Sequence, residues 1–587
     1  MSGVGSIYNI AKSALAVQRM GMEVTAHNLA NVDTEGYSRQ RTVVVSNQPL
    51  VQGGVFVGRG VNVDEVSRVT DGFIEGQLTQ QRSKLSSSGE TEKYMQVLEA
   101  LFNETSDNSI SAGLAEYWNL WQDVSNNPDG APERIALFEH ATLLSNQFNA
   151  LNQDLVQLQN DLSGSLDDML SQVNQLTSQI ADINAKIVSL ESNNTANDLR
   201  DQRNILMSEL SEIIDVKGFE QERGDMTIIS ARGAVLVQGK INFELQLGGS
   251  GGDRVVWTGS GGAEMDLTNH INQGSLGGLL DMRDEVIEKY RRDLDEVASE
   301  FIWSVNQQHS QGIGLNANST MTGTHAASDT TEEMGTSDSG LEYQDKIVDG
   351  TFKLWVYDAS GAVVGGGATT VTIDADAGGT TLSGLQSTID GVANISASIT
   401  VNNTLKIDAA GGYSFAFSDD TSNTLGALGL NTFFSGAGAG AITVNNAITL
   451  DKNKMAAAQI DSSGDFASGD NTNALAIADL QYTSQTISQW NVDRVNGNTE
   501  GSTTTTIEGY FHGMAGSIGI ASASASRTNT FNKEMLKTLS ERRDNISAVS
   551  LDEEMTNLVK YQSAYNAAAK LINASNEMLD ILMNLAG

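Results

Sequence analysis

The chain has 587 residues, a formal net charge of −38 and no cysteine. Its 73 acidic against 35 basic residues argue against nucleic-acid binding and against docking on an anionic membrane, because both need a basic surface. Disulfides and thiol chemistry are excluded. No apolar run is long enough to predict a membrane-spanning helix, and residues 1–9 lack the features of a cleaved secretory signal.

The first predicted element is an amphipathic helix over residues 4–30. Its small or apolar positions alternate three and four residues apart, which is the pattern of a coiled-coil interface. They are Ile7, Ile10, Ala14, Val17, Gly21 and Val24. A turn is predicted after Asn31, and a short strand at 41–46.

The longest apolar repeat runs from Leu151 to Leu190, with one extra four-residue step near Gly164. It stops at residues 192–196, and Asn197 is a plausible N-cap for a returning helix that reaches Ile213. This pattern predicts an antiparallel helical hairpin. Further helices are predicted at 278–309, 465–492 and 526–549.

Two regions between the helices resemble small β modules. Both 216–274 and 345–455 are rich in glycine and contain short alternating segments. The strands are predicted at 226–230, 234–238, 352–357, 370–373, 404–407 and 413–417. The stretch 312–340 is small and polar, which predicts a linker. The region from 301 to 480 contains no arginine and is acidic, which is typical of a surface-exposed insertion.

The C-terminus repeats the pattern of the N-terminus. Residues 551–583 keep the three- and four-residue spacing, with two polar interruptions. The apolar members are Leu551, Met555, Leu558, Tyr565, Ala569, Ile572, Leu579 and Met583. A single amphipathic helix is only marginally stable in water, so each terminal stripe needs a partner. The pattern leaves two partners open, the other terminus or a neighbouring subunit.

No catalytic or metal-binding motif is present. The six histidines form none of the usual zinc-ligand spacings, and without cysteine a zinc site is poorly supplied. Residues 233–240 (GAVLVQGK) depart from a phosphate-binding loop in spacing and in the residue after the lysine. Residues 374–379 (DADAGG) begin like a calcium loop, but Leu385 stands where the loop needs glutamate. We therefore predict no enzyme activity, no cofactor and no metal.

One motif does indicate a family. Residues 26–40 read AHNLANVDTEGYSRQ, and this segment resembles a motif shared by flagellar rod, hook and hook-associated proteins. The matching positions are Asn28, Leu29, Ala30, Asn31, Gly36, Tyr37, Ser38 and Arg39. Proline often precedes the glycine in that family, whereas Glu35 stands here.

Three further stretches resemble the hook-associated protein 1 family, which forms the hook–filament junction. They are 114–128 (with Arg134), 196–213 and 469–481. A fourth, 550–585, resembles the terminal pattern shared by axial flagellar proteins, and the ordered set is similar to the hook-associated protein 1 family. The resemblance covers roughly 1–315 and 463–587. Residues 320–460 match no family beyond a variable outer β domain.

The resemblance, together with the helix pattern, implies a multidomain α+β fold. A long α-helical bundle or coiled coil would be formed by the N- and C-terminal parts, with inserted, mainly-β outer domains. The expected divisions are an N-terminal helical part (1–215), a small β module (216–274), a helix returning to the helical core (275–318), a variable outer β domain (345–460) and a C-terminal helical part (463–587).

The function implied is that of a structural subunit of the bacterial flagellum. It would form the first junction layer between hook and filament and would be needed for filament assembly. The expected partners are identical copies in a ring, the hook protein, the second hook-associated protein and a cytoplasmic FlgN-like export chaperone. The chain would be extracellular, exported through the flagellar type III channel without a cleaved signal.

The subunit contacts are expected on the two terminal stripes. The predicted interaction residues are Ile7, Ile10, Ala14, Val17, Val24, Asn28, Asn31, Leu551, Met555, Leu558, Tyr565, Ile572, Leu579 and Met583. The alternatives are another axial flagellar subunit, an adhesin or binding module carried by 345–460, and a hydrolase without a recognisable motif.

Overall fold

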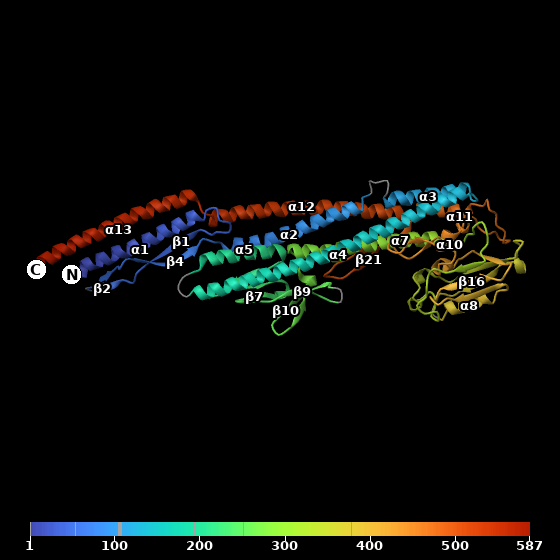
Figure 1. Ribbon diagram of the computed structural model, residues 1–587, viewed down its shortest axis with the longest axis horizontal. Helices are drawn as coiled ribbons and strands as arrows, with labels where there is room; N and C mark the ends of the chain where they lie inside the picture. The colour runs from blue at the N-terminus through green and yellow to red at the C-terminus, as the bar shows by residue number, and fades with distance from the viewer. Residues whose placement is uncertain are drawn as a thin grey trace. The chain divides into compact units, whose positions relative to one another are not determined.

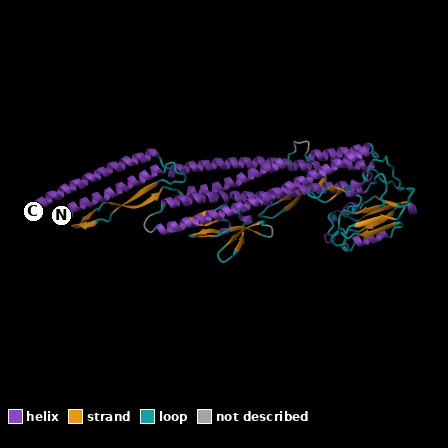
Figure 2. Cartoon of the chain, viewed as in Figure 1, coloured by secondary structure: helices purple, strands orange, loops and turns teal. Residues whose placement is uncertain are grey.

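The computed structural model describes residues 2–52, 55–103, 109–191, 195–249, 252–376 and 378–586 (Figure 1). Contacts divide the chain into two compact units. Unit 1 comprises Met1–Tyr94, Leu162–Met282 and Ala523–Gly587, and unit 2 comprises Met95–Asp161 and Arg283–Ser522. Long helices lie at both ends of the chain, and several small sheets lie between them in sequence. This arrangement confirms the predicted α+β class (Figure 2).

Three long helices contribute residues to both units: α2 (Gly72–Leu101), α4 (Ala131–Leu190) and α12 (Ile507–Ser547). The apolar repeat from Leu151 to Leu190 lies in α4, which is longer than the sequence pattern predicted. The predicted helix at 526–549 likewise forms the second half of α12.

The two ends of the chain pair within unit 1. Helix α1 (Ser2–Ala30) and helix α13 (Leu551–Ala586) lie side by side (Figure 1). Strands β1 (Gln40–Ser46) and β4 (Val61–Arg68) form an antiparallel ribbon that packs on α1. Between them, β2 (Leu50–Gln52) and β3 (Val55–Val57) form a second hairpin. The sequence left open whether each terminal helix packs on the other terminus or on a neighbouring subunit. In this structure the two terminal helices pack on each other.

The end of α4 and helix α5 (Asn197–Ile213) form the predicted helical hairpin in unit 1. Arg200 binds Glu191 at 2.7 Å, and Arg203 donates to Asn184 Oδ1 at 3.1 Å. The later residue of α5, Arg203, contacts the earlier residue of α4, Asn184. The two helices are therefore antiparallel. The predicted break at 192–196 lies largely outside the described residues.

The small β module of unit 1 contains two sheets. The first has the strand order β5-β6-β7-β8, and the second β11-β10-β9. Their bounds are β5 Lys217–Glu220, β6 Met226–Ile229, β7 Val235–Gln238, β8 Ile241–Asn242, β9 Leu245–Gly248, β10 Arg254–Thr258 and β11 Glu264–Asp266. Helix α6 (Gly274–Asp281) and a π-helical turn (Met282–Ile287) follow.

Unit 2 has an aromatic core. Helices α3 (Ile110–Asn126) and α7 (Glu288–Ser310) contribute Tyr117, Trp118 and Phe301, all fully buried. Phe433 joins them, with its ring centre 5.9 Å from that of Tyr117. The remaining helices of this unit are short: α8 Leu382–Asp390, α9 Thr424–Ala427, α10 Asn446–Leu450 and α11 Thr472–Ala478.

The strands of unit 2 form two three-stranded sheets and two hairpins. One sheet has the order β12-β16-β15 and the other β14-β13-β17, while β18-β19 and β20-β21 are two-stranded. Their bounds are β12 Thr320–Thr322, β13 Gly350–Tyr357, β14 Thr369–Ile373, β15 Ile395–Ile399, β16 Leu405–Ala409, β17 Ser414–Ser418, β18 Phe434–Ser435, β19 Thr443–Val444, β20 Gln485–Asn491 and β21 Thr499–Thr505. All four strands predicted between 352 and 417 are present.

Two local predictions are wrong. The segment 465–492 is helical only in α11 and a short 3-10 turn (Asp479–Tyr482), and Gln485–Asn491 is a strand paired with the threonine-rich β21. A β-branched partner strand outweighs a weak helical pattern. The predicted linker at 312–340 is packed: β12 pairs with β16, and Met334 is buried. Backbone hydrogen bonds, such as Gly323 N–H to Leu405 O at 2.8 Å, order it without any apolar periodicity.

Candidate subunit-interaction site

The centre of the paired termini is Asn28, at the end of α1, which is almost fully buried. Its amide group donates to Gln40 O at 2.9 Å and to Glu554 Oε2 at 3.1 Å. Its carbonyl oxygen accepts from the Tyr37 hydroxyl at 2.7 Å and from Gln40 N–H at 2.9 Å. All four hydrogen-bonding positions of the side chain are therefore used, and one residue joins α1, the following turn and α13.

Arg39 makes the second link to α13. Its Nε donates to Glu554 at 2.9 Å, and its Nη1 donates to Glu553 at 2.6 Å. Its backbone N–H donates to Ser547 O, just before α13 begins. Charge-assisted bonds from one guanidinium to two successive carboxylates fix the start of this helix.

Asp201 of α5 ties the same turn to the helical hairpin. Its carboxylate accepts from Ser38 N–H at 3.0 Å and from Arg68 Nη1 at 2.9 Å. Next to it, Asp198 accepts from the side chain of Gln40 at 3.0 Å. The motif residues 36–40 thus lie between α13 and α5, both within unit 1.

The turn itself follows from two residues. Asn31 donates from its side chain to His27 O at 3.0 Å, which caps the end of α1. Gly36 has φ +74°, a conformation that favours glycine, and a Cβ there would lie 2.6 Å from Ile205. Burial, reinforced by the nearby Asp198 and Asp201, raises the pKa of Tyr37, so its hydroxyl keeps the proton that it donates to Asn28.

The predicted stripe of α1 is only partly the face that packs. Val17 and Gly21 are buried, Ile10, Ala14 and Val24 are half-buried, and Ile7 is exposed. A Cβ at Gly21 would lie 2.7 Å from the ring of Tyr561, so the two helices approach closely there. The positions that the sequence pattern missed are Ala11 and Thr25, both buried.

The predicted stripe of α13 flanks the buried face instead of forming it. Leu558, Tyr565, Ile572 and Leu579 are half-buried, whereas Leu551, Met555 and Met583 are exposed. The residues that face α1 recur every seven positions, which is the one signal that could have found them. They are Glu554, Tyr561, Ala568 and Ser575.

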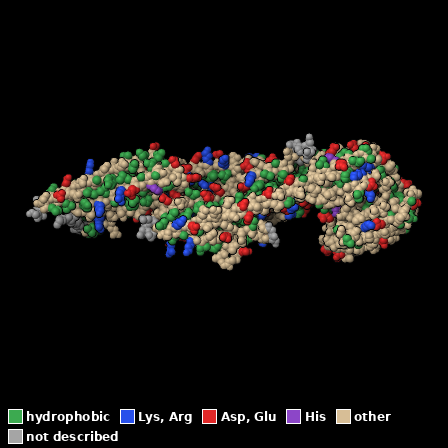
Figure 3. Space-filling view, in the orientation of Figure 1, with side chains coloured by type: hydrophobic (Ala, Val, Ile, Leu, Met, Phe, Trp, Pro, Cys, Tyr) green, Lys and Arg blue, Asp and Glu red, His purple; other side chains and the backbone are tan. Residues whose placement is uncertain are grey.

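An apolar surface remains on the outside of α13. Hydrophobic side chains gather over this helix in the space-filling view (Figure 3). The large exposed ones are Leu551, Met555, Val559, Leu571, Met578, Ile581, Leu582 and Met583. We call this set, apart from Leu582, the outer face of α13, since Leu582 lies seven residues after Ser575 in the row that faces α1. An exposed apolar surface of this kind is typical of a protein–protein contact.

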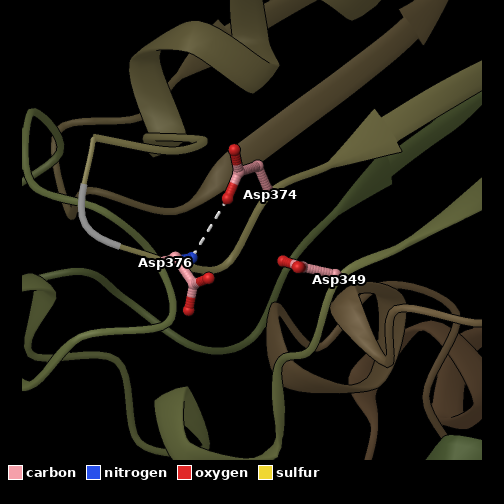
Figure 4. Close-up of side chains that lie close together, drawn as sticks. All are labelled: Asp349, Asp374 and Asp376. Atoms are coloured by element: carbon pink, nitrogen blue, oxygen red, sulfur yellow. Dashed lines mark hydrogen bonds between the residues drawn. The ribbon is translucent and has the colours of Figure 1, made fainter.

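One group of carboxylates could hold a cation. Asp349, Asp374 and Asp376 lie close together on exposed loops of unit 2 (Figure 4). Two of the carboxylates already accept from backbone N–H groups: Asp374 from Asp376 at 3.2 Å, and Asp349 from Ala375 at 2.8 Å. Exposed acidic groups are expected on so acidic a chain, and this one indicates no function by itself.

The most buried histidine is a structural residue. His309 Nδ1 contacts Asn431 O at 2.7 Å, and its Nε2 accepts from Ala456 N–H at 2.9 Å. Burial lowers its pKa to about 4, so the ring is neutral.

In the part of the chain that the structure describes, no helix is both long and apolar enough to cross a bilayer.

Three family models match the chain. Residues 95–323 match "Flagellar hook-associated protein FlgK helical domain", residues 9–37 "Flagella basal body rod protein", and residues 543–585 "Flagellar basal body rod FlgEFG protein C-terminal". The last two matches cover most of α1 and of α13, the helices that meet at Asn28.

The chain is also similar to whole relatives. It is 26% identical to flagellar hook-associated protein 1 of Salmonella typhimurium, over 99% of this chain and 100% of that one. The protein of the same name from Bacillus subtilis is 26% identical, over 98% of this chain and 97% of that one. The solved structure of the flagellar hook junction protein FlgK from Burkholderia pseudomallei shares the fold, with a TM-score of 0.51 and 17% identity over 81% of this chain and all of that one. Over nearly its whole length the chain is therefore similar to proteins named flagellar hook-associated protein 1.

Proposed function

We propose that the chain is a structural subunit of the bacterial flagellum, forms the first junction layer between hook and filament, and is needed for filament assembly. The observation that carries this proposal is the match from end to end with relatives named hook-associated protein 1, over 99% of this chain. A match limited to the shared terminal helices would equally fit any axial subunit. The family model at 95–323 separates this chain from those.

The paired termini support this role mechanically. Asn28 and Arg39 hold α1 against α13, and the outer face of α13 stays free for neighbouring molecules. Burying apolar surface contributes roughly 25 cal/mol per Å². Contacts repeated around a ring of copies add this contribution many times over.

We propose four partners for these surfaces: identical copies, the hook protein, the second hook-associated protein and, before export, a FlgN-like cytoplasmic chaperone. The chaperone would cover the outer face of α13 and so prevent early assembly. The proposed route is the flagellar type III channel, without a cleaved signal. A chain without disulfides suits passage through a narrow channel, because nothing covalent keeps it folded.

The proposed role is structural and not enzymatic, with no cofactor or metal. The division into helical parts 1–215, 275–318 and 463–587 and β parts 216–274 and 345–460 remains our proposal for the domain organisation. Among the predicted interaction residues, Ile7, Leu551, Met555 and Met583 have the exposure that a contact with another molecule needs.

The proposal is tested by deleting the gene in its source bacterium, imaging the cells and assaying the medium for flagellin. Hooks without filaments, with flagellin in the medium, are expected. Normal filaments would overturn the junction role, and missing hooks would point to an earlier axial component.

The contact surface is tested by restoring the gene with L551D and M555D together. Both residues are exposed, so folding should survive while filaments are lost. T556D with S563D is the matched control, because these residues are exposed on the same helix but are polar and are not among the apolar residues of the outer face. The control should restore filaments.

A further inference from the structure

The hairpin β2–β3 exposes apolar side chains; we call the segment 47–58 the arm, of which the structure describes 47–52 and 55–58. Leu50 is 54% exposed, Val51 59% and Phe56 74%. Val51 and Phe56 are directly opposed in the strand register, so they share one face of the hairpin. Within the described residues, β2 and β3 form a two-stranded sheet of their own, which is marginally stable in water.

A cavity of about 810 Å³ lies elsewhere in unit 1, between the start of α2, helix α5 and the first β sheet. This volume falls in the range of pockets that hold whole ligands. Met207, Phe219, Met226 and Ile229 supply apolar walls. Methionine side chains adapt to the shape of an incoming group, which suits a docking pocket. None of the arm residues that the structure describes lines this cavity.

Two glycines keep one wall of this cavity open. Gly72 and Gly76 lie four residues apart on α2, and a Cβ on either would meet no atom within 4 Å. Glycine weakens a helix relative to alanine, so helix stability does not explain this pair. In the same cavity, the buried Oδ1 of Asp215 has no hydrogen-bond partner, and it could accept from an incoming N–H group.

Charge favours the arm as the occupant of the cavity. The arm contains no charged residue, in a chain whose net charge is −38. The cavity wall carries both signs, with Glu75 and Asp215 balanced by Lys217 and Arg232. Two copies of so acidic a chain repel over most of their surface, so neutral surfaces are where they meet at the smallest electrostatic cost.

We propose that the arm of one copy docks into the cavity beside Met207 and Met226 of a neighbouring copy, with Val51 and Phe56 inserted. The contact joins two different surfaces of the same chain, so it is heterologous and propagates around a ring or a helix. This inference rests on the proposed assembly of copies into a junction layer. It identifies the contact that would join one copy to the next.

Cross-linking tests the contact directly, because the chain has no cysteine of its own. Flagella from cells that carry V51C with K217C are treated with a short bismaleimide and examined by immunoblot. The expected result is a ladder of multimers of this chain. V51C alone, K217C alone and V51C with G164C should stay monomeric. A monomer in every lane, or a cross-link to a different protein, would overturn the proposal.

Filling the cavity gives the second test. G76L should leave the melting temperature of the protein at or above that of the parent, because leucine suits a helix better than glycine. It should lower the cross-linked fraction of V51C with K217C by about tenfold, as expected when a central contact is blocked. G164L is the matched control, since Gly164 is also exposed, helical and free of nearby atoms, and does not line this cavity. An unchanged ladder in G76L would refute the docking.

These results separate the inference from the proposed function. If the gene deletion removes filaments but the ladder is absent, the arm contact is wrong and the junction role stands. If the deletion leaves filaments intact, the junction role itself fails.

Discussion

Asn28 shows how one side chain can specify where three segments meet. Its four hydrogen bonds satisfy the Tyr37 hydroxyl, the backbone of Gln40 and one oxygen of Glu554 in a place that water hardly reaches. A buried polar group left without a partner costs about 1–3 kcal/mol. Aspartate in its place would lack the two donors and would face the carboxylate of Glu554, so only an amide of this length suits the site.

Asp215 should make unit 1 less stable at neutral pH. Burial raises its pKa from 3.8 to about 6, and Lys217 opposes this only in part. Between pH 4 and 6 the folded state binds more protons at this carboxyl than the unfolded state does. The free energy of unfolding therefore falls as the pH rises through that window and then levels off. We expect D215N to be more stable than the parent at pH 8 by about 1–3 kcal/mol.

The measurement is hydrogen exchange of the backbone amides in β5, β6 and β7, which report the opening of this part of unit 1. The difference between D215N and the parent should shrink as the pH approaches 4, where Asp215 is protonated. D253N, at an exposed loop residue, is the control and should show no such difference. Equal stabilities of D215N and parent at pH 8 would contradict the prediction.

At this scale the sequence indicated only part of the candidate site. The motif containing Asn28 and Arg39 was identified through a family resemblance. Their partner Glu554 is 526 positions from Asn28, and Asp201 is 163 positions from Ser38. Nothing local distinguishes these two carboxylates among 73 acidic residues, because their role depends on which segments the fold brings together.

Among the elements, the helices with a sustained apolar repeat were the most predictable from the sequence, whereas the long helix α2 and the first half of α12 were not predicted. A 3.6-residue period sustained over many turns is a strong signal, and α1, α4, α5 and α13 follow from it. The face that packs was less predictable. In α13 small and polar residues such as Ala568 and Ser575 are buried, while Met555 and Met583 are exposed. Close approach of two helices selects small residues, which the apolar pattern overlooks.

Gly21 should control how closely α1 and α13 approach each other. A Cβ there would lie 2.7 Å from the Tyr561 ring, so G21V should force the helices apart. Overpacking of this kind typically costs 1–3 kcal/mol. We expect limited proteolysis within residues 551–586 to become about tenfold faster, since 1.4 kcal/mol corresponds to a factor of ten.

A16V is the matched control for this change, because Ala16 lies on the exposed face of the same helix. Valine lowers helix propensity relative to alanine, whereas it raises it relative to glycine. If propensity decided the outcome, G21V would be the more stable variant. Slower or equal proteolysis of G21V would therefore show that the helices do not meet at this glycine.

On the scale of whole units, the segment around Phe433 is part of the packed core of unit 2 and is not a separate insertion on its surface. Asn306 of α7 accepts from Phe433 N–H and Phe434 N–H at 3.0 and 2.8 Å, and donates to Phe434 O at 3.0 Å. The Phe434 ring lies 5.1 Å from that of Phe301. The sequence could not predict this integration, because the segment around Phe433 is short, rich in glycine and without periodicity.

This packing predicts that two deletions in unit 2 differ in effect. Removing Phe352–Ser418 leaves flanks that are already joined, since Thr351 and Thr421 exchange hydrogen bonds at 2.9 Å. This deletion removes Trp355 and Tyr357, which pack against Ile313, and it keeps Phe433. Removing 345–460 takes away Phe433 and Phe434 together, and each large aromatic residue lost from a core costs about 3–5 kcal/mol.

Near-ultraviolet circular dichroism during heating, together with binding of a dye that detects exposed apolar surface, should separate the two variants. The shorter deletion should keep a cooperative transition and low dye binding, because Tyr117, Trp118 and Phe301 stay covered. The longer one should lose the transition and bind dye, since it uncovers that aromatic cluster. In cells, filaments should then survive only the shorter deletion. If both variants melted alike and both supported filaments, residues 345–460 would be decoration, and the contacts of Asn306 with Phe433 and Phe434 would be unimportant for the stability of unit 2.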